Sequence, residues 1–124
     1  MACILVFLPI KATLITVMVL VGVDFVTGVL AARKAGKPIT SAGFKRTVVK
    51  LFVYELVVML GFLTEQYLTG DMVPVTKILG GLIGLTELKS VLENAQALTG
   101  IPIIQLLIDK LNRSEKDINN IEGL

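Results

Sequence analysis

The sequence predicts an all-α integral membrane protein with three transmembrane helices and a short C-terminal amphipathic helix. The chain has 124 residues, of which 54% are hydrophobic, and its mean hydropathy is +0.81, a composition more apolar than that of soluble globular domains. Three segments contain about 20 mostly apolar residues, the length that crosses the hydrocarbon core as a helix. They cover residues 12–32, 48–68 and 73–92, and we expect a membrane domain over residues 1–98.

The composition excludes several kinds of site. His is absent and Cys3 is the only cysteine, so the chain offers no zinc site, no Cys/His nucleophile pair and no intramolecular disulfide. A net charge of +2 is too small to indicate a nucleic-acid-binding surface. The sequence also lacks a paired nucleophile and base and a Gly-rich phosphate loop, so we expect neither an enzyme nor a bound cofactor.

The first apolar segment, residues 12–32, contains one charged side chain, Asp24. A secretory signal peptide is the competing interpretation, but its apolar core is shorter, about 7–15 residues, and a basic flank follows where a cleavage site is expected. The apolar extension of residues 1–10 leaves the register open. A helix that enters the membrane at Ile4 would bury Lys11 and place Asp24 at the cytoplasmic interface.

The linker between the first two segments is strongly basic. Residues 33–50 include Arg33, Lys34, Lys37, Lys45, Arg46 and Lys50 and no acid. The positive-inside rule places this linker in the cytoplasm, with the N-terminus outside and the C-terminus inside. We assign these residues to topology and to binding of anionic lipid headgroups. Pro38 and Gly43 interrupt the linker, and a new helix is expected near Thr40 or Ser41 with the hydroxyl as N-cap.

The C-terminal region is predicted to hold one more helix. Gly100 and Pro102 are typical of a helix end. Residues 101–112 form an amphipathic pattern that should lie on the membrane or against a partner helix. Residues 113–124 are polar and are expected to be mobile.

Polar and small residues inside the apolar segments indicate helix association. A charged side chain at the bilayer centre costs about 2.5–3.5 kcal/mol, so Asp24 should not face lipid. Small residues let neighbouring helices approach closely in lipid. The candidate oligomerisation and pore-lining residues are Asp24, Thr27, Gly28 and Ala31 in the first segment, and Lys77, Gly80, Gly84, Glu87, Ser90 and Asn94 in the third.

Two interpretations of these residues are open. They can hold the three helices together within one monomer. Alternatively, one small monomer cannot bury all the intramembrane charges, so copies associate and line a polar lumen. The charged residues concerned are Asp24, Glu55, Glu65, Lys77 and Glu87. We favour the second interpretation.

Two stretches, DFVTGVLAARKAGKPITSAGFKRTVVK from Asp24 and ELKSVLENAQALTGIPIIQLLIDKLN from Glu87, resemble the small phage holins of the toxin-secretion/phage-lysis family. In that family an Asp closes the first hydrophobic stretch, a TG and basic residues follow, and a late Glu-Asn pair precedes a glycine-containing turn. The matching positions are Asp24, Thr27, Gly28, Lys37, Ser41, Gly43, Arg46, Lys50, Glu87, Glu93, Asn94 and Gly100. The extension over residues 1–10 and the additional Glu65 depart from the family pattern.

The resemblance implies a holin that assembles in the host bacterial cytoplasmic membrane and opens holes for an endolysin, a toxin or a bacteriocin. The implied partners are further copies of the chain, the lipid bilayer and an endolysin that need not touch it. A non-lytic membrane protein is the alternative. Such a protein would be a structural component of a phage particle or secretion machine, or a small transporter subunit.

Overall fold

The computed structural model describes residues 2–124, which form helices joined by short connections, and no β-strand occurs among them. The elements in chain order are α1 (Ala2–Val6), the short 3-10 helix η1 (Leu8–Ile10), α2 (Lys11–Lys34), α3 (Ser41–Tyr67), α4 (Val75–Thr99) and α5 (Ile103–Glu122). The all-α prediction is confirmed.

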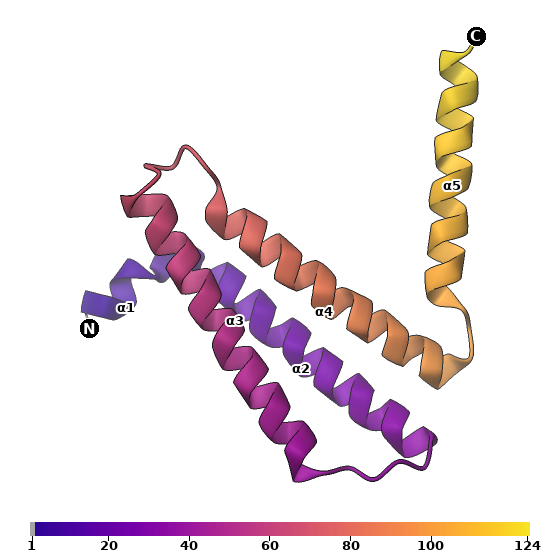
Figure 1. The fold of residues 1–124 in the computed structure, drawn as a ribbon, viewed down its shortest axis with the longest axis horizontal. Helices are drawn as coiled ribbons and strands as arrows, with labels where there is room; N and C mark the ends of the chain where they lie inside the picture. Colours follow the sequence, from indigo (N-terminus) through magenta and orange to yellow (C-terminus); the bar gives the residue numbers. More distant parts are fainter. Residues whose placement is uncertain (1) are drawn as a thin grey trace.

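Helices α2, α3 and α4 form a bundle in which each helix contacts the other two (Figure 1). The chain reverses direction between α2 and α3 and again between α3 and α4, so α2 and α4 run the same way. Helix α5 is bent away from α4 by 118° and projects from the bundle (Figure 1). The molecule therefore consists of a three-helix bundle and one separate arm.

The bundle has a small core and an apolar exterior. The buried apolar side chains are Ile10, Val17, Val21, Val58, Phe62 and Ile83. Many larger apolar side chains point outward, among them Met18 on α2, Phe52 and Leu60 on α3 and Leu85 on α4. Exposing this much apolar surface to water would cost about 25 cal/mol per Å². Hydrocarbon is therefore the solvent that suits the outside of this bundle.

Two of the three predicted spans are clear in the structure. The segment of η1 and α2, Leu8–Lys34, and helix α3 are each long and apolar enough to cross a membrane. Helix α4, which contains the predicted third span, meets the same criteria only together with α5, as a pair bent by 118°. The structure therefore confirms a membrane protein with at least two span-forming helices and leaves the count of three as a prediction.

The start of the first span is interrupted. Helix α1 ends at Val6, and η1 contains Pro9, whose ring removes a backbone donor. The unbroken α-helix begins only at Lys11. A continuous helix from Ile4, the alternative register, does not form.

The turn before α3 has the predicted cap. Thr40 lies just before the helix in an extended conformation, and its Oγ1 accepts a hydrogen bond from the Gly43 backbone N–H at 3.4 Å. A Thr at this position satisfies one of the free donors of the first turn. The prediction that a hydroxyl near residue 40 caps this helix is confirmed.

The structure differs from the expected boundary of the C-terminal helix. Gly100 ends α4 in the left-handed conformation, with φ of 71°, as predicted. Helix α5, however, continues to Glu122, beyond the predicted end at residue 112 and through the expected mobile tail. Ile118 and Ile121 follow Leu111 by 7 and 10 positions, so the apolar stripe of the helix extends to its end.

Candidate functional site

A charged cluster joins the three bundle helices. The Nζ of Lys50 on α3 lies 2.8 Å from Asp24 Oδ2 on α2 and 2.8 Å from Glu87 Oε2 on α4. The side chains of Lys50, Asp24 and Glu87 are 28%, 17% and 1% exposed, respectively. One ammonium thus connects two carboxylates from different helices within the bundle.

Two further side chains complete this charged cluster. Tyr54 donates its hydroxyl proton to Glu87 Oε1 at 3.0 Å. The Asn94 amide on α4 donates to Asp24 at its Oδ1 (3.1 Å) and its backbone oxygen (3.2 Å), and to Thr27 Oγ1 (3.1 Å). Buried charges are tolerated when they are paired and hydrogen-bonded in this way.

The charged cluster corrects two expectations. Asp24 does avoid lipid, but it finds its partner within the monomer rather than on a second copy. Lys50, grouped with the headgroup-binding residues, turns instead into the bundle. It lies nine residues into a helix that starts at Ser41, about 13 Å from the helix start.

The small residues of α2 and α4 let these two helices approach each other. An added Cβ at Gly28 would lie 3.5 Å from Asn94 Nδ2, and one at Gly80 would lie 3.1 Å from Thr13 Cγ2. At Gly84 the nearest atom would be Leu20 Cδ1, at 3.8 Å. At these glycines α2 and α4 therefore approach each other closely within one monomer.

A groove between α2 and α4 contains the remaining small residues. Its volume is about 330 Å³, and it is lined by Ala12, Thr13, Thr16, Val17, Leu20, Thr76, Lys77, Gly80, Gly81 and Gly84. Thr76 is only 5% exposed, and its Oγ1 has no hydrogen-bond partner within residues 2–124. Lys77 is exposed beside it. Of the other candidates, Ala31 and Ser90 are half-buried.

The other basic residues gather at the end of the bundle where α2 ends and α3 begins. Arg33, Lys34, Lys37, Lys45 and Arg46 are all exposed there. Lys34 has an additional contact, because its Nζ donates to the Leu98 carbonyl in the last turn of α4 at 2.6 Å. A cation at this position suits the negative end of a helix.

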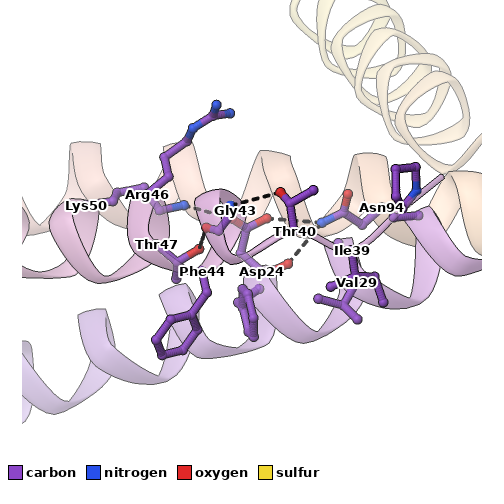
Figure 2. Close-up of a pocket in the computed structure, with 14 residues that line it drawn as sticks. Asp24, Val29, Ile39, Thr40, Gly43, Phe44, Arg46, Thr47, Lys50 and Asn94 are labelled. Atoms are coloured by element: carbon purple, nitrogen blue, oxygen red, sulfur yellow. Dashed lines mark hydrogen bonds and ion pairs between the residues drawn. The ribbon is translucent and has the colours of Figure 1, made fainter.

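A second cavity, of about 380 Å³, lies at the same end of the bundle (Figure 2). Asp24, Lys50 and Asn94 lie along it, and the linker residues Ile39 and Thr40 also line it (Figure 2). The rings of Phe25 and Phe44 meet edge to face in its wall, with centroids 5.8 Å apart. The charged cluster is therefore reached from the basic end of the bundle.

Sequence reasoning missed the role of Glu65. Its carboxylate accepts a hydrogen bond from the Thr76 backbone N–H at 2.7 Å, in the first turn of α4. The residue before that helix is Pro74, which supplies no side-chain cap. Glu65 therefore replaces the missing N-cap from the preceding helix. The absence of a capping side chain near Pro74 was the signal in the sequence.

A second ion pair, also missed, lies on the outside of α4. Lys89 Nζ is 3.7 Å from Glu93 Oε1, one helical turn away, and the two side chains are 73% and 54% exposed. We call Lys89 and Glu93 the outer pair. Their spacing of four residues is visible in the sequence. Their outward orientation is known only from the structure, in which Glu87 on the same helix packs into the bundle.

The intramembrane charges thus divide into two groups. Asp24, Glu65 and Glu87 have partners within the monomer, so the premise that one monomer cannot accommodate them is wrong for these three. Glu55 is half-buried, and its Oε1 has no hydrogen-bond partner in the part of the chain that the structure describes. Lys77 makes no ion pair among residues 2–124.

Comparison with protein families gives one match. The model of the bacteriophage holin family matches residues 2–116, which is almost the whole chain and includes the bundle and most of α5. Comparisons with curated proteins and with solved structures give no match. Since the family match covers far more than half of the residues and agrees with the apolar helices, this chain is a member of the bacteriophage holin family.

Proposed function

We propose that this protein associates in the host cytoplasmic membrane and opens holes through which an endolysin, or a toxin or bacteriocin, leaves the cell. The observation that carries the proposal is the outer pair, Lys89 and Glu93, which is exposed on the outside of α4 beside large exposed apolar side chains such as Leu85. In a lone bundle this face of α4 would meet lipid, and charged side chains exposed to lipid are costly. Copies arranged with α4 toward a common water-filled lumen remove that penalty.

The proposal includes α4 as a third span. Two contacts support it, one at each end of α4. Its first turn is bonded to Glu65 near the end of α3, and its last turn to Lys34 at the end of α2. A helix attached at both ends to two spanning helices crosses the same layer as they do. The basic linker then lies in the cytoplasm, with the N-terminus outside and the C-terminus inside.

In this mechanism the charged cluster and the outer pair have different tasks. The charged cluster, Asp24, Lys50 and Glu87, holds each bundle together before assembly. The outer pair lines the lumen. The groove between α2 and α4, with its small residues Gly80 and Gly84, receives a helix of a neighbouring copy.

Residues of the charged cluster reach the lumen only if the bundle itself opens. Each added copy extends the shared polar surface, so opening depends steeply on copy number. The activity needs no cofactor and no direct contact with endolysin, because a hole of sufficient size passes any cytoplasmic enzyme.

Inducible expression in a bacterial host tests this function. Membrane potential and culture turbidity are recorded together, with and without a co-expressed cytoplasmic endolysin. We expect abrupt depolarisation in both cultures and lysis only with the endolysin. Steady growth with an intact potential, at confirmed membrane levels of the protein, would contradict the proposal and favour a non-lytic structural or transport role.

A further inference from the structure

The cavity at the basic end of the bundle has an apolar side and a polar side. It lies between the second half of α2 and the first turns of α3, and linker residues also line it (Figure 2). On α3, Phe44 and Arg46 lie about 200° apart around the helix axis, and Figure 2 shows their side chains extending in opposite directions. Phe44 meets Phe25 of α2 on the apolar side. The ion pair of Asp24 and Lys50 borders the polar side.

The polar side of this cavity has a cation to offer. Arg46 lines the cavity one helical turn before Lys50, is exposed, and makes no ion pair among residues 2–124. Four further basic residues are exposed at the same end of the bundle. In the charged cluster two carboxylates share one ammonium, a net charge of −1, which the exposed basic residues outweigh. The mouth of the cavity therefore attracts anions.

We propose that this cavity binds the phosphate headgroup of an anionic phospholipid. The Arg46 guanidinium donates to the phosphate, for which its planar fork is suited, and the first chain segments of the lipid lie against Phe25 and Phe44. The volume of about 380 Å³ falls within the range of small-molecule sites, about 300–1,000 Å³. Basic pockets between transmembrane helices are typical sites for anionic lipid headgroups. The inference does not depend on hole formation, because every copy in the membrane meets such lipids.

A phospholipid fits this cavity better than a soluble anion or a second copy of the chain. Ile39 and Phe44 line the cavity and are 51% and 58% exposed, so apolar surface adjoins the cations. A soluble phosphate would leave that apolar surface in water, whereas lipid chains cover it. A second copy inserted in the same orientation brings the same basic residues to this depth, and like charges oppose its docking.

Fluorescence quenching in vesicles tests the lipid site. The chain contains no tryptophan, so a single Phe44→Trp substitution reports only the surroundings of this cavity. The full-length protein is reconstituted into mixed phosphatidylglycerol and phosphatidylcholine vesicles in which one lipid or the other carries brominated, quenching chains. The ratio of the two quenching values gives the local preference for the anionic lipid. Leu30→Trp, an exposed position on the side of α2 away from the cavity, is the matched control.

We expect the preference for phosphatidylglycerol to be about fivefold greater at Phe44→Trp than at Leu30→Trp. Arg46→Gln should remove this difference, whereas Lys45→Gln, at an exposed position that does not line the cavity, should leave it.

Three results would overturn the proposal. The first is an equal preference at the two tryptophan positions, or no quenching at Phe44→Trp by either lipid. The second is an equal effect of Arg46→Gln and Lys45→Gln, which would indicate general attraction to the basic end. The third is loss of the difference in excess soluble glycerol phosphate, which would assign the cavity to a free anion.

Discussion

Helix α4 carries two charged sites that are two residues apart in sequence and opposite in direction. Glu87 points into the bundle, where Lys50 and Tyr54 satisfy its carboxylate. Lys89 and Glu93 point outward and have only each other. Two residues turn a helix by about 200°, so the same helix presents one charge to the core and the next to the surroundings. The inner site connects the three helices of one monomer, and in the proposed function the outer site favours association with further copies.

The largest expected effect comes from removing the inner cation. Lys50→Met leaves Asp24 and Glu87 without their ammonium inside the bundle. Breaking a buried ion pair by removing one partner costs about 3–5 kcal/mol. We expect this loss in the free energy of unfolding of the purified protein, measured by denaturant titration in detergent. Lys45→Met, at an exposed position of the same helix, is the control and should lose almost nothing. If the two variants were equally stable, the buried charge of Lys50 would contribute no more to the free energy of unfolding than the exposed charge of Lys45, and the account would be contradicted.

A smaller change keeps the shape of the inner site and removes one charge. In Asp24→Asn the Asn94 amide and Lys50 can still bond to the remaining oxygen, so we expect a loss of about 1–2 kcal/mol in the free energy of unfolding. A weaker bundle should also change the time at which the host loses its membrane potential. Recordings of membrane potential at matched expression measure this, and a time course that coincides with that of the unchanged protein would count against a role for Asp24.

The adjacent glycines Gly80 and Gly81 test the difference between the inner and outer faces of α4 without changing a charge. Gly80 faces Thr13 of α2, whereas a Cβ at Gly81 would meet nothing within 4 Å. Alanine favours a helix over glycine by about 1 kcal/mol. Gly81→Ala should therefore raise the free energy of unfolding by up to that amount, and Gly80→Ala should gain less or lose stability because Thr13 must move. Thermal unfolding in detergent compares the two variants. A larger gain for Gly80→Ala would mean that α4 has a different rotation in the bundle.

The smallest effect is expected at the start of α4. Glu65→Gln weakens the bond to the Thr76 backbone N–H by removing the carboxylate charge, and a lost cap costs about 1 kcal/mol. Amide hydrogen exchange should accelerate in the first turn of α4 and remain unchanged near Gly100. Uniform exchange along the helix would show that Glu65 does not hold this end.

Much of the fold could be predicted from patterns that act locally. The apolar runs, the Thr40 cap and the Gly100 stop depend on neighbouring residues, and the structure confirms that these helices exist and where α3 begins and α4 ends. The end of α5 was missed because Ile118 and Ile121 are isolated among polar residues, and only their register with Leu111 identifies them as one stripe.

The partners inside the bundle could not be predicted in the same way. Asp24 and Glu87 were identified as candidates because charges are rare in apolar segments. Their common partner Lys50 lies in a basic run that topology alone explains. Assigning it required the depth and rotation of α3 relative to α2 and α4, which depend on contacts between residues 26 and 37 positions apart. The direction of Lys89 and Glu93 follows from that same rotation.

Water access to the outer pair tests the central claim most directly. In a Cys3→Ser background, Glu93→Cys is treated with a membrane-impermeant thiol reagent before and after the induced host depolarises. Val49→Cys, an exposed apolar position on α3 beside Lys50, is the lipid-facing control. We predict that Glu93→Cys becomes reactive at depolarisation while Val49→Cys stays unreactive. A Glu93→Cys thiol that stays unreactive in depolarised cells would contradict a lumen lined by α4.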